Sequence, residues 1–262
     1  MNEIVEIGPW RLASAYLFLV ILLFLVNRQG IGREKEIFIS AMRMTVQLIA
    51  VGYLLVYIFE QKHVAVTLLV LVVMQFFAIR NIYGRVKVPI KKKLRHVIIL
   101  SLVTGTGATI FYFLSLVINI EPWYEPRYFI PIAGMIIGNS MTGISIGAER
   151  MIDEMKSKKE MIEGALMLGA TPRDATAIIV KNSFTAAIMP AINTMVGMGI
   201  VFLPGMMTGQ ILAGLSPLVA IEYQIAIMLS ILGSVTITVF ILTRLGYTVF
   251  FNRWSQLEEN DL

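Results

Sequence analysis

Oxygen-bearing side chains gather in one apolar stretch of the chain, GMIIGNSMTGISIG, at residues 134–147. Asn139, Ser140, Thr142 and Ser145 supply one amide and three hydroxyl groups within seven positions. Neutral oxygen atoms are ligands for hard cations, so these four residues are candidates for a polar stripe along a substrate pathway. Hydrogen bonding between packed membrane helices would use the same groups, and the sequence leaves both interpretations open.

A carboxylate is the next candidate. Glu222 is the one charged residue between Lys181 and Arg244. An acidic group near a membrane can attract cations when it faces the protein interior, so Glu222 joins the candidate pathway residues. A position among lipid headgroups is the alternative.

Methionines form the third group with possible chemistry. Several lie in or near the same apolar stretches: Met135, Met141, Met195, Met198, Met206 and Met207. Thioethers suit soft Cu(I) better than iron, although methionine more often serves as adaptable packing material. The chain has no cysteine and two histidines, so a zinc-type site is not expected, and the sequence names no metal ligands.

The elements that carry these residues are predicted to be membrane helices. The chain of 262 residues is 57% hydrophobic and 15% charged, against about 25% charged residues in soluble domains. A membrane helix needs about 20 mostly apolar residues. Seven runs satisfy this requirement: 10–27, 39–59, 63–83, 97–119, 128–148, 185–203 and 219–243. We therefore expect an all-α polytopic membrane protein with about seven transmembrane helices in a single domain, residues 1–262.

Charge in the loops predicts the orientation. With the N-terminus outside and the C-terminus inside, 17 of the 22 Lys and Arg residues fall in cytoplasmic segments. Arg11, Lys62 and Arg127 fall outside. Cytoplasmic loops of membrane proteins carry an excess of basic residues, so this orientation is favoured. The segment 204–218 becomes an external turn or a re-entrant segment.

The cytoplasmic segment 149–184 contains the sequence EGALMLGATPRDA. Apolar residues at three- and four-residue spacing predict an amphipathic helix, and Gly169 stands where a left-handed residue ends such a helix. Thr171 is an N-cap candidate, Pro172 suits the first helical position, and Asp174 suits the first turn. The segment therefore predicts two helices that meet at a short exposed corner. A hairpin that merely folds against its own bundle is the alternative.

Glu163, Gly164, Ala165 and Gly169 together resemble the EAA motif of ABC-transporter permeases, through which a permease docks on its ATPase subunit. Gly164 stands where the motif usually has a second alanine. The stretches MIIGNSMTGISIGAERM, EGALMLGATPRDA and MPAINTMVGMGIVFLPGMMTGQILAG resemble the FetB-type permease family of bacterial iron exporters and plant aluminium-tolerance proteins. The resemblance assigns ATPase coupling to the following residues: Glu163, Gly164, Ala165, Gly169, Ala170, Thr171 and Pro172.

The resemblance implies a non-catalytic permease subunit that exports metal ions such as iron across a bacterial inner membrane. It further implies a permease homodimer with two copies of a cytoplasmic ABC ATPase, which would bind the ATP and Mg²⁺. This chain has no Walker A pattern and would bind no cofactor or nucleic acid; its remaining partner is the lipid membrane. A permease for a nucleotide-sugar or another small solute, and an ion-coupled secondary carrier, stay open as alternatives.

Overall fold

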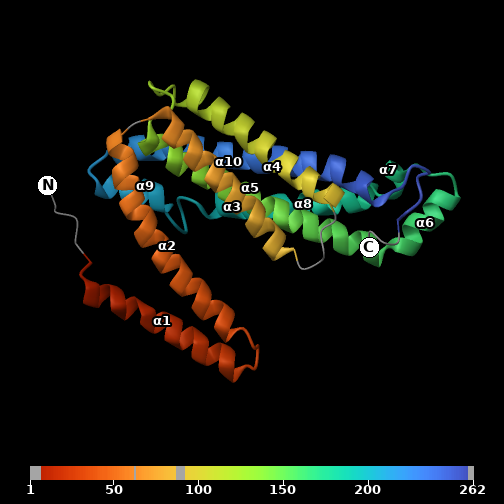
Figure 1. Cartoon of the computed structure of the whole chain (residues 1–262), viewed down its shortest axis with the longest axis horizontal. Helices are drawn as coiled ribbons and strands as arrows, with labels where there is room; N and C mark the ends of the chain where they lie inside the picture. Colours follow the sequence, from red (N-terminus) through yellow and green to blue (C-terminus); the bar gives the residue numbers. More distant parts are fainter. Residues whose placement is uncertain (1–6, 62, 87–91, 259–262) are drawn as a thin grey trace. The chain divides into compact units, whose positions relative to one another are not determined.

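The computed structural model describes residues 7–61, 63–86 and 92–258, which group into two units (Figure 1). The first unit consists of helices α1 and α2 together with residues 212–214, and the second contains the other elements from His63 onward. Each unit is described by itself. The prediction of a single domain stays a prediction.

The first unit is a helical hairpin made of α1 (Pro9–Arg28) and α2 (Glu34–Gln61). Gly30 and Gly32 adopt positive φ angles in the turn between the helices, a backbone region that glycine enters without steric cost. The hydroxyl groups of Tyr16 and Thr45 form a hydrogen bond between α1 and α2. Buried side chains are few in this unit.

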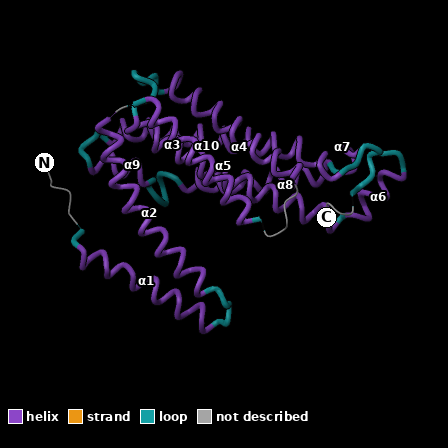
Figure 2. The backbone as a smooth tube through the Cα atoms, viewed as in Figure 1, coloured by secondary structure: helices purple, strands orange, loops and turns teal. Residues whose placement is uncertain are grey.

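The second unit is a bundle of long helices with short helices at two of its connections (Figures 1 and 2). No strand occurs among residues 7–61, 63–86 and 92–258. Its elements, in chain order, are α3 (Val64–Arg85), α4 (Lys92–Tyr112), the π-helical turn η1 (Phe113–Val117), α5 (Pro126–Ser157), α6 (Lys159–Met167), α7 (Pro172–Ala175), α8 (Ala177–Gly197), α9 (Gly205–Leu212), α10 (Pro217–Gly246) and the 3₁₀ turn η2 (Tyr247–Phe250).

Six of the described helices are long and apolar enough to cross a membrane, namely α1, α2, α3, α4, α5 and α10. They correspond to six of the seven predicted spans. This all-helical arrangement is that of a polytopic membrane protein, whereas the count of seven and the orientation stay predictions. The connection predicted at 204–218 contains the short helix α9.

The predicted boundaries of the sixth span, 185–203, are wrong. The helix at this position, α8, starts eight residues earlier and ends at Gly197. Lys181 and Asn182 lower the local hydropathy, which hides the first turns of α8, but they do not interrupt the helical backbone. The chain turns away from the helix at Gly199, where φ is +85°.

The core of the second unit forms around α5, which packs against α3, α4, α8 and α10. Glycines allow this close packing, because small residues let helix backbones approach one another. A Cβ atom added at Gly143 would lie 2.9 Å from a Val235 methyl carbon, and one at Gly147 would lie 3.2 Å from Ala187 Cβ. Here a larger side chain would force the helices apart.

A matched pair of glycines in α4 tests this packing. A Cβ at Gly105 would overlap the Thr238 side chain and lie 3.1 Å from the Thr238 backbone, whereas Gly107 has open space. We expect Gly105→Ala to lower the free energy of unfolding by about 1–3 kcal/mol because it overpacks the α4–α10 contact. Gly107→Ala should be neutral or stabilising by up to about 1 kcal/mol. Denaturant unfolding of the purified protein measures both, and equal effects would contradict the predicted role of Gly105.

Candidate functional site

The four polar residues predicted on α5 point to two different sides of the helix. Ser140 and Ser145 are buried inside the bundle. The Ser140 hydroxyl lies 2.8 Å from the Ser234 hydroxyl of α10, and Ser145 donates to the Met141 carbonyl at 2.8 Å. Ser140 therefore links two helices, and Ser145 is satisfied within its own helix.

Asn139 and Thr142 lie on the more open side of α5. Asn139 is exposed and donates to the Met135 carbonyl at 2.8 Å. Thr142 is half-buried and accepts a long hydrogen bond of 3.5 Å from Arg85 at the end of α3. A Cβ added at the neighbouring Gly138 would meet nothing within 4 Å. Whether this side lines a path stays a prediction, but it is the side of α5 with free space.

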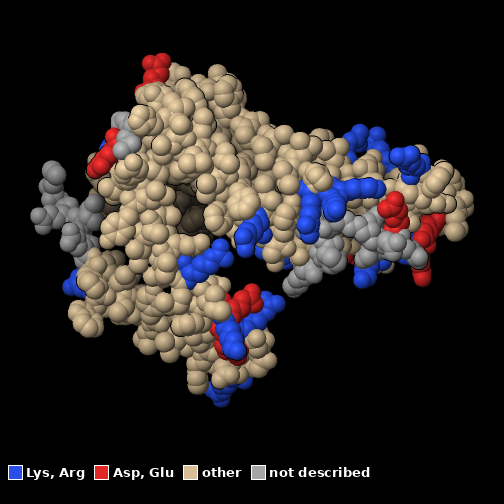
Figure 3. Space-filling model, viewed as in Figure 1, with Lys and Arg blue, Asp and Glu red and all other residues tan. Residues whose placement is uncertain are grey.

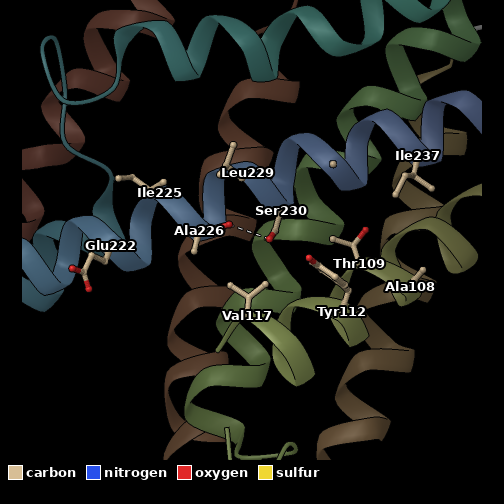
Figure 4. Close-up of a pocket in the computed structure, with 11 residues that line it drawn as sticks. Ala108, Thr109, Tyr112, Val117, Glu222, Ile225, Ala226, Leu229, Ser230 and Ile237 are labelled. Carbon is tan, nitrogen blue, oxygen red and sulfur yellow. Dashed lines mark hydrogen bonds between the residues drawn. The ribbon is translucent and has the colours of Figure 1, made fainter. Parts of the chain in front are cut away.

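Glu222 lies apart from these residues, in a groove between α4, η1 and α10 (Figure 4). The groove has a volume of about 870 Å³ and mainly apolar walls. Its lining includes Glu222, Thr109, Tyr112 and Ser230 but no residue of α5. Ser230 is already engaged with the Ala226 carbonyl at 3.0 Å. The structure therefore does not bring Glu222 together with the α5 stripe.

The corner between α6 and α7 has the caps that the sequence predicts. Gly169 has φ +88°, and the N–H groups of Gly169 and Ala170 donate to the carbonyls of Leu166 and Ala165 at 3.0 Å each. These two bonds form a Schellman motif, which satisfies the last carbonyls of α6. The corner therefore ends α6 in a defined conformation.

The start of α7 is capped as well. Thr171 Oγ1 accepts a hydrogen bond of 3.3 Å from the Asp174 N–H and donates one of 2.6 Å to the Asp174 carboxylate. Pro172 occupies the first helical position, where its fixed φ suits the helix. Two caps, separated by Ala170, thus fix the backbone on both sides of the corner.

Two large apolar side chains stand exposed at this corner. Met167 is 86% exposed and Leu168 is 91% exposed. Several Lys and Arg side chains lie toward the end of the second unit that carries α6 and α7, on the face that Figure 3 shows. Along the chain, the two apolar residues are flanked by the charged residues Glu163, Arg173 and Asp174.

The segment 149–184 is less separate from the bundle than predicted. Its first nine residues continue α5 to Ser157, and its last eight belong to α8. Lys158 interrupts the predicted amphipathic helix between α5 and α6. The apolar side of that stretch is buried at Met151, Met155 and Ile162. Only α6, α7 and the corner between them project from the α5–α8 pair (Figure 1).

A buried carboxylate that sequence reasoning missed connects this region to the bundle. The Glu154 side chain is buried and carries ion pairs to Arg150 at 2.7 Å and to Lys158 at 2.6 Å. Asn182 of α8 donates to both carboxylate oxygens, at 3.1 and 3.2 Å. The four-residue spacing of Arg150, Glu154 and Lys158 predicts the ion pairs, but nothing in the sequence points to Asn182. The group joins α5 to α8 next to the corner.

Among the described residues, no three His, Cys, Asp or Glu side chains lie together as a metal-ligand set. The four polar residues predicted on α5 are neutral, and Glu222 is the charged residue among those that line the groove. The arrangement offers a helical bundle with polar positions along α5 and a rigid corner at one end.

Helices of this length and hydropathy, packed through glycines, define the class: the chain is an integral membrane protein. It belongs to the uncharacterised protein family UPF0014, which matches over residues 9–251. A membrane protein of this family from Synechocystis, slr1647, is 37% identical over 89% of this chain and 90% of its own length. The probable iron export permease protein FetB of Escherichia coli is 34% identical over 94% and 93%.

Protein ALUMINUM SENSITIVE 3 of Arabidopsis thaliana is also similar, with 35% identity over 96% of this chain and 90% of the plant protein. No solved structure matches the chain. The resemblance to the FetB-type family is thereby confirmed.

The Glu154 group gives a stability prediction. Glu154→Gln removes the charge that Arg150, Lys158 and Asn182 share, so we expect it to lower the free energy of unfolding by about 1–3 kcal/mol. Glu163→Gln is the matched control. Its pair with Lys159 spans 3.8 Å at the surface, and such pairs contribute about 0–1 kcal/mol. Detergent-based unfolding curves compare the two variants, and an equal loss would contradict the structural role of Glu154.

The two sides of α5 give a second prediction. Asn139→Leu removes an amide group from the predicted substrate pathway, so it should abolish substrate transport. The unfolding transition should stay unchanged, because Asn139 is exposed and bonds only its own helix. Ser140→Ala should instead lower stability by about 0.6 kcal/mol, a typical value for a hydrogen bond between membrane helices. Transport into proteoliposomes and unfolding curves measure the two effects. Unchanged transport by Asn139→Leu would show that this side of α5 serves packing alone.

Proposed function

We propose that the chain is the transmembrane permease subunit of an ABC transporter that exports metal ions, with iron as the first candidate, and that a separate ATPase drives it. The exposed, doubly capped corner at Met167–Thr171 is the observation that carries this proposal. The printed name of the Escherichia coli relative, a probable iron export permease, supports the choice of substrate.

The corner has the properties that a docking element needs. Small residues at Gly164, Ala165, Gly169 and Ala170 let a partner approach the backbone, and Met167 and Leu168 offer apolar contact area. An exposed apolar patch on an otherwise charged surface marks an interaction site. Because both helix ends are capped, a force on the corner displaces α6 and α7 as a body.

Glu154 and Asn182 extend this rigidity toward the membrane. They join α5 to α8 next to the corner, so displacement of the corner reaches both long helices. In the proposed assembly, two permease chains in a bacterial inner membrane bind two cytoplasmic ATPases, which hold ATP and Mg²⁺. ATP binding draws the two corners together and switches the bundles between inward-facing and outward-facing states.

Substitution at the tip of the corner tests the docking role. We expect Met167→Asp/Leu168→Asp to reduce co-purification with the ATPase at least tenfold, because charge replaces apolar contact at a surface that must lose its water. Both side chains are exposed, so the fold should not change. Ile200→Asp/Val201→Asp is the matched control: both side chains are exposed but lie in the turn after α8, outside the corner, so complex formation should be retained. Undiminished binding by the Met167→Asp/Leu168→Asp variant would contradict the docking assignment.

Transport by reconstituted protein separates this proposal from its alternatives. Inside-out vesicles that contain the permease and the ATPase should accumulate Fe(II) only when ATP is present. Accumulation driven by an ion gradient without the ATPase would instead indicate a secondary carrier. ATP-dependent uptake of a nucleotide-sugar without metal transport would retain the ABC assembly and replace the substrate.

A further inference from the structure

Four methionines surround a pocket at the end of the second unit that lies away from α6 and α7 (Figure 1). Met195 and Met198 come from the end of α8, Met207 from α9 and Met228 from α10. The pocket has a volume of about 390 Å³, and no charged residue lines it. We call it the methionine pocket.

Local backbone structure explains why these thioethers converge. Met195 lies in the last turn of α8, and Met198 directly follows the last residue of that helix. The helix ends at Gly197, and the following turn leads to α9, which carries the buried Met207. Met228 lies one turn after Gln224 on the same side of α10. Three separate segments therefore contribute methionine side chains to the lining of one pocket.

The side chain of Gln224 indicates, independently of the methionines, that the pocket holds a ligand. Its side chain lines the pocket and the residue is only 7% exposed. The Nε2 group donates to Met198 Sδ at 3.7 Å, whereas Oε1 is buried and has no hydrogen-bond partner. A buried polar atom without a partner costs about 1–3 kcal/mol and calls for a group that satisfies it. An apolar filling such as an acyl chain would leave this oxygen unsatisfied.

The chemistry of the lining selects the ligand. Thioethers are soft, neutral donors that favour Cu(I) and similar soft ions. Hard ions prefer carboxylate and other oxygen ligands, and the pocket contains no carboxylate. The cost of desolvating an ion also rises steeply with its charge, so a neutral pocket accommodates a monovalent ion far better than a divalent or trivalent one.

We propose that the methionine pocket is a site for a soft monovalent metal ion of the Cu(I) or Ag(I) type, with thioether sulfurs and Gln224 Oε1 as ligands. The inference rests on the proposed function as a metal-ion exporter and adds a soft monovalent ion to the ions that this chain binds. Methionine side chains have three rotatable bonds, so they can close around an ion much smaller than the cavity.

Equilibrium binding of Ag(I) to the purified permease in detergent, in competition with a chromogenic chelator, tests the site. The wild type should bind one Ag(I) per chain, and Fe(II) should not displace it. Met195→Leu/Met198→Leu/Met228→Leu should weaken binding at least about 100-fold, and Gln224→Leu about tenfold. The matched control, Met42→Leu/Met44→Leu/Met161→Leu, changes three exposed methionines elsewhere and should bind as the wild type does.

Equal binding by the pocket variant and the wild type, or no saturable Ag(I) site in the wild type, would overturn the proposal. Leucine nearly conserves the volume of methionine, so the variant should fold. If it does not, X-ray absorption on the Ag(I)-loaded wild type decides: a sulfur shell is expected, and a shell of oxygen or nitrogen alone would overturn the site.

The binding assay contains no ATPase, so its outcome is independent of the proposed transport cycle. Loss of ATP-driven efflux with intact Ag(I) binding would reject the ABC assignment and keep the site. Conversely, ATP-driven Fe(II) efflux by a protein that does not bind Ag(I) would reject the site and keep the transporter.

Discussion

The close contact of α5 with α8 and α10 is the interaction on which the second unit depends. Lipid is as apolar as the helix surfaces, so burial of hydrophobic side chains gives little driving force for helix association in a membrane. Van der Waals packing must supply it instead, which requires the backbones to come close. Gly143 and Gly147 provide this proximity, and the Ser140–Ser234 hydrogen bond fixes the register between α5 and α10.

This packing gives α5 its mechanical role in the proposed transporter. The helix runs from the tight contacts in the bundle to Ser157, where α6 leads on to the exposed corner, without interruption. At its far end Glu154 engages Asn182, so α5 and α8 share one rigid connection just before the chain turns. The same α8 ends at the methionine pocket. In the proposed transporter, α8 therefore connects the region of the corner with the methionine pocket.

Much of this architecture follows from local sequence patterns. Hydropathy predicts α1, α2, α3, α4, α5 and α10, because a membrane helix must satisfy its backbone within a single apolar run. The cap residues Gly169, Thr171 and Pro172 predict the corner, since each acts within four residues of its own position. Features of this kind depend only on neighbours along the chain.

The features that the sequence did not predict depend on contacts between distant segments. The predicted sixth span begins at residue 185 because Lys181 and Asn182 lower the local hydropathy, and only the contact of Asn182 with Glu154 explains their place inside α8. The methionine pocket was missed for the same reason. Met198 and Met207 were recognised as possible soft ligands, but Gln224 and Met228 join them only through the packing of α10 against α8.

The open side of α5 and the methionine pocket are the two places where a cation could bind, and they differ in the charge around them. Thr142 on the open side of α5 accepts a hydrogen bond of 3.5 Å from Arg85, so its oxygen is already engaged. Its hydroxyl also donates to the Gly138 carbonyl, which further occupies the group. The methionine pocket has no basic side chain in its lining and retains an unpartnered oxygen.

A transport site must bind its ion firmly enough to select it and weakly enough to release it. Neutral thioethers and one amide oxygen meet both requirements for a soft monovalent ion, whereas a buried cluster of carboxylates would hold a multivalent ion too tightly to let it leave.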